Sequence, residues 1–176
     1  NQANIMQQAI QKHKSSGSIA TLLVMEHPEV GTKFGGVWTN QDSTIIGFGK
    51  TPQAKATKGY HNVGIAIFSD RILNYIKSGE SNILYDGLTQ AIQDGQQAQV
   101  VPISCQWFET GNEVDFKLAT KQCLEILTQS SFAAKYLAQL VQSRSPNSQF
   151  SSAGNKLLLT DNRLSLSSLT LNGFNV

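Results

Sequence analysis

The chain has 176 residues, of which 40% are hydrophobic and 15% charged, a composition typical of a globular protein with one core. Its net charge is +2 and its basic residues are scattered, which argues against nucleic acid as the main partner, because neutralising phosphates requires a concentrated basic patch. No apolar run approaches the ~20 residues that cross a bilayer, so we expect no membrane-spanning segment and no membrane partner.

Helical and strand-like patterns alternate along most of the sequence. Turn residues at 40–43 lie between two short strand patterns and predict a hairpin. The predicted order is a helix over 1–14, strands over 19–25, 35–38, 44–48 and 62–68, helices over 71–77 and 83–93, a strand over 98–105, and helices over 113–129 and 132–142. This alternation is typical of an α/β fold, and it predicts a mainly parallel sheet with helices on its faces.

The sequence changes character near residue 143. Residues 144–154 are rich in Ser, Asn and Pro, which is typical of a linker. Residues 155–176 then alternate apolar and polar side chains and predict a short β tail that buries little area alone. We therefore predict one domain over 1–143, a linker over 144–154, and a tail that docks elsewhere or forms the first turns of a β-solenoid.

The cysteines indicate the cellular compartment of the protein, and the first residues indicate whether further sequence precedes them. Cys105 and Cys123 are the only cysteines, and they fit neither a metal site nor a disulfide framework. We therefore expect buried free thiols in a cytoplasmic protein. Residues 1–14 do not resemble a signal peptide. The chain begins on a helical pattern without a methionine, which predicts that an N-terminal portion precedes it.

The most informative segment is the turn Trp-Phe-Glu-Thr-Gly-Asn at residues 107–112, between a predicted strand and a predicted helix. Asn112 and Asp115 form a variant of the capping box, which predicts where that helix begins. Ligands of open α/β sheets bind at the carboxyl ends of strands, and a carboxylate there can hold Mg²⁺ through one oxygen. Glu109 is therefore a candidate metal ligand; the alternative is a solvated loop carboxylate. Trp107 either stacks on a ligand or packs in the core.

Two further segments offer candidate binding residues. Asn62 could present its amide to ligand hydroxyls, and Gly64 would let a ligand approach the backbone. The alternative is a strand start that needs a tight approach between neighbouring strands. Lys50 follows a predicted strand in a flexible loop and could reach an anionic group, although most such lysines are merely solvated. No glycine-rich phosphate loop of a common type is present.

In order along the chain, these segments resemble the sugar-phosphate nucleotidyltransferases, the NDP-sugar pyrophosphorylases with the GT-A-like fold. The resemblance runs from about residue 1 to 129. It is carried by Ala20-Thr21-Leu22-Leu23-Val24, Phe34-Gly35-Gly36-Val37, Ile45-Ile46-Gly47-Phe48-Gly49-Lys50-Thr51-Pro52, Asn62-Val63-Gly64-Ile65-Ala66-Ile67-Phe68, Ser81-Asn82-Ile83-Leu84-Tyr85-Asp86 and Trp107-Phe108-Glu109-Thr110-Gly111. The resemblance implies a three-layer α/β/α Rossmann-like fold that is incomplete at its N-terminus.

The resemblance also implies a reaction, in which a sugar 1-phosphate attacks the α-phosphate of a nucleoside triphosphate and releases pyrophosphate. Mg²⁺ would be the cofactor, and Glu109 would occupy the place of the family's second metal-binding acid, usually aspartate. Asn62, Gly64 and Trp107 would face the substrate, and Lys50 the sugar phosphate. The nucleotide-binding half of the family's domain is absent from this chain, so we expect these residues alone not to catalyse.

Two departures from the family pattern keep other functions open. Glutamate replaces aspartate at position 109, and Gly49 stands where the family has an acid before its lysine. One alternative is therefore a non-catalytic or regulatory module that binds a sugar nucleotide. Another is an interaction domain whose β tail pairs with a second chain, which would make the protein a homo-oligomer.

Overall fold

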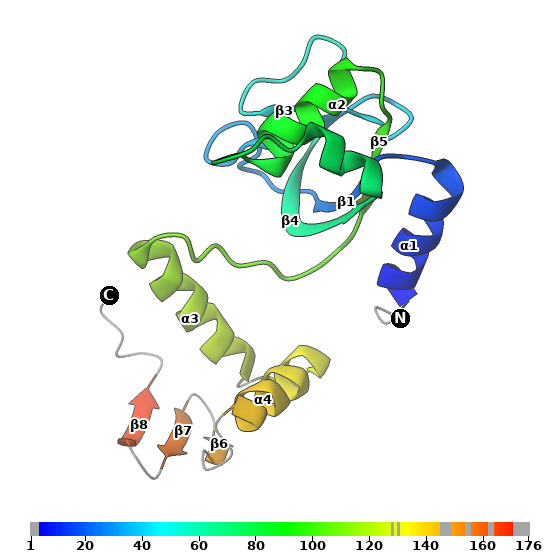
Figure 1. Ribbon diagram of the computed structural model, residues 1–176. Coiled ribbons are helices and arrows are strands. Elements are labelled where there is room, and N and C mark those ends of the chain that lie inside the picture. Colours follow the sequence, from blue (N-terminus) through cyan, green and yellow to red (C-terminus); the bar gives the residue numbers. More distant parts are fainter. Residues whose placement is uncertain are drawn as a thin grey trace. The chain divides into compact units, whose positions relative to one another are not determined.

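The computed structural model describes residues 4–127, 129, 131–144, 149–153, 156–161 and 164–170. The chain divides into two compact units, Asn1–Gln106 and Trp107–Val176, which we call the first and second unit. Figure 1 shows a mixed α/β arrangement in the first unit, and helices followed by short strands in the second.

The first unit is built on a five-stranded sheet. The strands are β1 (Ala20–Met25), β2 (Gly36–Thr39), β3 (Ile45–Gly49), β4 (Lys58–Phe68) and β5 (Ala98–Pro102). Their order across the sheet is β3-β2-β4-β1-β5. Only β1 and β5 pair in parallel; the β1–β4, β2–β4 and β2–β3 pairs are antiparallel.

Opposite faces of this sheet are covered by different helices, because successive side chains of a strand point to opposite faces. The face of β1 that carries Leu22 packs in the main core together with Ile72 and Leu88. These two residues come from the 3₁₀ helix η2 (Asp70–Tyr75) and the π-helical turn η3 (Ile83–Leu88), which continues into α2 (Thr89–Gln93). On the other face, Thr21 bonds to His13 of helix α1 (Ile5–Ser16). The first unit is thus a three-layer α/β/α structure, and the predicted α/β class is confirmed.

The prediction of a mainly parallel sheet is wrong. The predicted hairpin does form, as β2 and β3. The strand after it, β4, is longer than predicted and begins at Lys58, so it returns antiparallel between β2 and β1. Alternating elements require parallel pairing only where a helix connects two neighbouring strands. In this sheet the helices that follow β1 and precede β5 all lie between β4 and β5, and these two strands are not neighbours, because β1 lies between them.

The predicted helices form with local deviations. The helix predicted over 83–93 begins with the π turn η3, which Asn82 caps by accepting hydrogen bonds from the amides of Leu84 and Tyr85 through its side chain. The predicted strand over 98–105 is regular only to Pro102.

The second unit contains α3 (Glu113–Leu127), α4 (Phe132–Arg144), β6 (Gln149–Ala153), β7 (Lys156–Asp161) and β8 (Leu164–Thr170). The predicted cap of α3 is confirmed, because Asn112 Oδ1 accepts the amide of Asp115 at 3.0 Å. The three strands form an antiparallel sheet in the order β6-β7-β8. The predicted linker and tail lie partly outside the described residues, so their bounds and the β-solenoid stay predictions.

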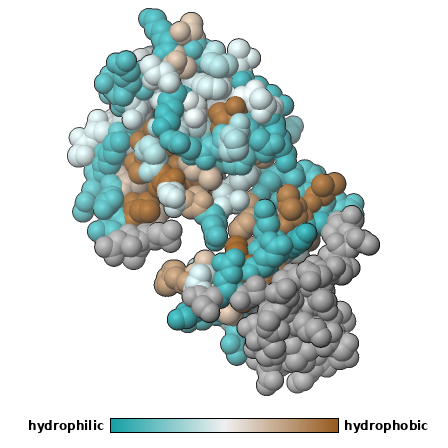
Figure 2. Space-filling model, turned by 180° about the vertical axis from the view of Figure 1, so that it is seen from behind, coloured by the Kyte–Doolittle hydropathy of each residue, from teal (hydrophilic) through white to brown (hydrophobic). Residues whose placement is uncertain are grey.

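Apolar side chains are exposed on both helices of the second unit, including Phe116 of α3 and Phe132 and Tyr136 of α4. Figure 2 shows exposed hydrophobic patches, in brown, among hydrophilic side chains, in teal. Within the described part of the chain, no helix is long and apolar enough to cross a membrane.

Candidate functional site

The registers of the sheet place two predicted site residues at one edge. Gly36 pairs with Gly49, and Val37 pairs with Tyr60. Extending the β2–β3 register by one residue and the β2–β4 register by two residues brings Lys50 and Asn62 level with Gly35, one on each side of β2. Neighbouring strands lie about 4.8 Å apart, so the two backbones are separated by about 10 Å. Asn62 also pairs with Val24 near the end of β1, which identifies this as the carboxyl edge of β1.

The turn that carries Lys50 is fixed by Trp38 of β2. The indole Nε1 of Trp38 donates to the carbonyl of Gly49 at 2.8 Å. Gly49 has φ 117°, a backbone conformation that residues with a Cβ rarely adopt. Glycine at position 49, where the family has an acid, therefore fits the backbone of this turn. Lys50 itself is exposed and follows the last residue of β3.

Asn62 and Gly64 lie in an irregular part of β4. The pairing with β1 shifts between Leu23 and Val24, which leaves two extra residues on β4, Val63 and Gly64, in a β-bulge. The Asn62 side chain accepts the amide of Gly64 at 3.1 Å, and Gly64 has φ 85°. A Cβ on Gly64 would meet nothing within 4 Å. The alternative reading of a strand start with a tight approach is therefore wrong: glycine is needed for its backbone conformation, inside a strand that begins at Lys58.

Trp107 and Glu109 belong to the second unit, so only Lys50, Asn62 and Gly64 share one unit. Glu109 Oε1 accepts hydrogen bonds from the amides of Thr110 at 2.8 Å and Gly111 at 2.6 Å. The carboxylate thus caps its own turn and is held in one orientation. Trp107 is half-buried.

A lone carboxylate of this kind fits Mg²⁺, which is commonly held by one or two protein carboxylates together with substrate phosphates and water. Among the described residues, no group of three or more His, Cys, Asp or Glu side chains could hold a metal ion. The chain therefore offers no all-protein metal cage within that part, and Glu109 would depend on a phosphate to complete the coordination.

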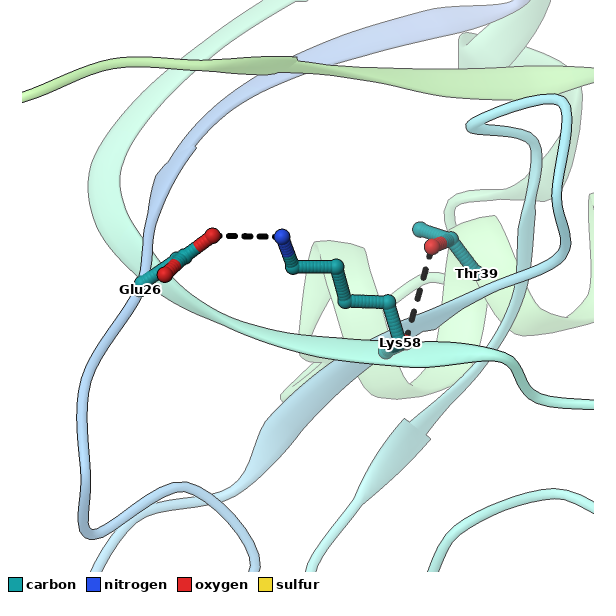
Figure 3. Close-up of polar contacts among 3 residues, drawn as sticks. All are labelled: Glu26, Thr39 and Lys58. Atoms are coloured by element: carbon teal, nitrogen blue, oxygen red, sulfur yellow. Dashed lines mark hydrogen bonds and ion pairs between the residues drawn. The ribbon is translucent and has the colours of Figure 1, made fainter.

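A second lysine near this part of the sheet is already paired. Lys58, at the start of β4, forms an ion pair with Glu26, and its carbonyl accepts from Thr39 Oγ1 at 3.5 Å (Figure 3). The hydrogen bond and charge of Lys58 lower the pKa of Glu26, and the hydrogen bond to Glu26 raises the pKa of Lys58. The pair is exposed, so water screens it strongly. Lys58 is engaged by Glu26, whereas Lys50 is exposed at the end of β3 and stays the candidate cation of this edge.

Two residues of the edge were not singled out by sequence reasoning. A Cβ on Gly35 would lie 2.7 Å from the hydroxyl oxygen of Tyr85, so the tyrosine hydroxyl lies against Gly35. Tyr85 comes from η3, and its ring makes an edge contact with Phe48 of β3, with the ring centres 6.2 Å apart. The Gly-Gly pair at 35–36 was the only local signal, because the approach of η3 to β2 depends on tertiary packing.

Comparison with a family profile identifies the family of this chain. A family profile described as nucleotidyl transferase matches residues 2–126. A UTP–glucose-1-phosphate uridylyltransferase from Synechocystis is 28% identical over 119 residues, which cover 66% of this chain and 31% of that protein. A Bacillus anthracis structure, assigned as a glucose-1-phosphate thymidylyltransferase in complex with a sucrose, is 19% identical with a TM-score of 0.49 and covers 66% of this chain and 48% of that one. The chain thus spans about a third of the curated relative's length and about half that of the solved one.

Proposed function

Because the chain belongs to the nucleotidyl transferase family, we propose that it forms the acceptor side of a sugar-1-phosphate nucleotidyltransferase, the side that holds the sugar 1-phosphate. In that reaction a phosphate oxygen of the sugar 1-phosphate attacks the α-phosphorus of a nucleoside triphosphate, and pyrophosphate leaves. The observation that supports the proposal best is the row of Lys50, Gly35 and Asn62 at the carboxyl edge of β1, where sheets of this class bind ligands.

Each of the candidate residues has a role in this proposal. Lys50 neutralises the phosphate of the sugar 1-phosphate, since an ammonium group on a long stem acts as a mobile point charge. Asn62 hydrogen-bonds a sugar hydroxyl from two strands away. The bulge at Gly64 removes a side chain from the edge, and Trp107 offers an aromatic face to the substrate.

Glu109 would hold Mg²⁺ in this proposal. The ion, when bound, neutralises phosphate charge as the α-phosphate is transferred. The chain's own contribution is to orient one carboxylate, because the amides of Thr110 and Gly111 fix Oε1. Glutamate reaches one methylene further than the family's usual aspartate, and this curled-back geometry shortens that reach.

The proposal is tested by titrating the chain with α-D-glucose 1-phosphate, the sugar phosphate named in the relatives' descriptions. Lys50→Ala should weaken binding by about tenfold or more, since a hydrogen bond to a charged group contributes about 1.5–3 kcal/mol. Lys55→Ala removes another exposed lysine of the same loop and should leave binding unchanged. Equal affinities for wild type and the Lys50 variant would contradict the assignment.

A non-catalytic binding module is the second candidate, favoured by Gly49 in place of the family's acid. The two candidates differ in their dependence on metal. If the site serves catalysis, Mg²⁺ should tighten binding of the sugar 1-phosphate, and Glu109→Gln should abolish that gain, whereas Glu113→Gln, a change at the first residue of α3, should not. If the affinity for the sugar 1-phosphate does not depend on Mg²⁺ in wild type or in either variant, the non-catalytic module is favoured.

A further inference from the structure

Tyr85 is an exposed aromatic residue at the centre of the proposed site. Its residue surface is 53% accessible, although it lies in η3 between residues that pack in the core. An aromatic ring left this exposed beside a sheet edge gains little from burial. The ring and hydroxyl of Tyr85 are therefore accessible to a ligand.

The backbone of Tyr85 is held firmly. Asn82 Oδ1 accepts the amides of Leu84 and Tyr85, each at 3.0 Å, and Asp86 accepts the amide of Asn82 at 2.7 Å. The next residue, Gly87, is buried, and a Cβ there would lie 3.3 Å from the carbonyl oxygen of Tyr75 in η2. The tyrosine side chain is thus presented from a rigid turn, which limits the entropy lost when it contacts a ligand.

The hydroxyl of Tyr85 lies on the same face of the sheet as Asn62. Gly35 is two residues from Val37, and Asn62 is two residues from Tyr60; Val37 and Tyr60 both pack in the main core. By strand alternation, a side chain at position 35 and the side chain of Asn62 therefore point to that same face. The space that a Gly35 side chain would fill is occupied by the tyrosine hydroxyl. The row across the edge thus reads Lys50, then the Tyr85 hydroxyl over Gly35, then Asn62.

We propose that Tyr85 is a substrate-contacting residue of the acceptor site, whose hydroxyl hydrogen-bonds a sugar hydroxyl between the phosphate at Lys50 and the group bound by Asn62. This inference rests on the proposed function. It also explains glycine at position 35, because the absence of a Cβ there lets the tyrosine hydroxyl lie between Lys50 and Asn62. The ligand class is a phosphorylated monosaccharide, because the row combines one cation with neutral hydrogen-bonding groups.

The experiment compares Tyr85→Phe and Gly35→Ala with wild type, using α-D-glucose 1-phosphate and inorganic phosphate as probes. Loss of one hydrogen bond predicts a rise of about 3–10-fold in Kd for the sugar phosphate in Tyr85→Phe. Gly35→Ala should show a similar rise, because its methyl group displaces the far end of the tyrosine, and the double variant should show no further rise. Binding of inorganic phosphate should be unchanged in all three.

Tyr136→Phe is the matched control, since the accessible fraction of Tyr136 in α4 is 59%, similar to the 53% of Tyr85. It should bind both probes like wild type, and thermal unfolding should show that all variants are folded. An unchanged Kd for the sugar phosphate in Tyr85→Phe, with wild type binding and Lys50→Ala impaired, would overturn this inference alone. If wild type binds neither probe, the proposed function fails and this inference fails with it.

Discussion

Polar contacts of single residues fix the layers of the first unit as well as its candidate site. His13 of α1 is buried, and its Nδ1 lies 3.0 Å from Thr21 Oγ1 on β1. The same hydroxyl oxygen accepts a hydrogen bond from Gln99 Nε2 at 3.0 Å. The Thr21 hydroxyl thus contacts both the imidazole of His13 and the amide of Gln99. Helix α1 and the sheet are therefore joined through a buried histidine.

This contact predicts a pH dependence of stability. Burial, and next the positive charge of Arg71, lower the pKa of His13 below the ordinary histidine value of 6.5. A lowered pKa in the folded state means that the unfolded chain binds more protons at mildly acidic pH. The contribution of His13 is thus fully present above pH 6.5 and is lost as the pH falls below that value. Thermal unfolding from about pH 7.5 to about pH 5.5 should show a falling melting temperature in wild type.

His13→Gln should reduce this dependence, because glutamine keeps a hydrogen-bond acceptor near Thr21 and does not titrate. The variant is expected to be less stable at neutral pH and to lose less on acidification. If wild type and the variant lost stability in parallel between the two pH values, the titration of His13 would not be its source.

At the scale of elements, the sequence predicted most of the strands and helices and the β2–β3 hairpin, but not how the other strands pair. The apolar run of β1 and the capping residues Asn112 and Asp115 act locally, and both predictions hold. Pairing depends on which strands lie side by side, and local patterns contain no such information. The bulge at Gly64 and the contact of Tyr85 with Gly35 likewise arise from tertiary packing. The row of candidate residues therefore required the structure, although Lys50 and Asn62 were candidates from the sequence alone.

The pairing of β2 with β4 leads to a prediction about packing. Trp38 pairs with Gly59, and a Cβ on Gly59 would lie 2.2 Å from the indole ring. The ring is buried and bonded to Gly49, so it cannot move aside easily. Gly59→Ala should therefore cost about 1–3 kcal/mol of unfolding free energy, measured by urea denaturation. Gly35→Ala meets only the end of a flexible side chain and should cost clearly less; equal costs would contradict this packing.

At the scale of the whole molecule, the candidate residues are divided between the two units. The first unit contains the row of Lys50, Gly35 and Asn62, and the second contains Glu109 in its aromatic turn. The family assignment covers most of both the sheet and α3, since the match runs from residue 2 to 126. Proteins of this class transfer a group mainly by positioning phosphates and neutralising their charge. The proposal therefore depends on where a sugar phosphate binds.

The most direct test is an NMR titration of ¹⁵N-labelled chain with α-D-glucose 1-phosphate, read residue by residue. We predict saturable shift changes at the amides of Gly35, Lys50 and Asn62, and at the indole N–H of Trp38, which bonds to the turn before Lys50. The amide chemical shifts of α4 should not change. Changes confined to α3 and α4, or no saturable change at this edge of the sheet, would contradict the proposed acceptor site.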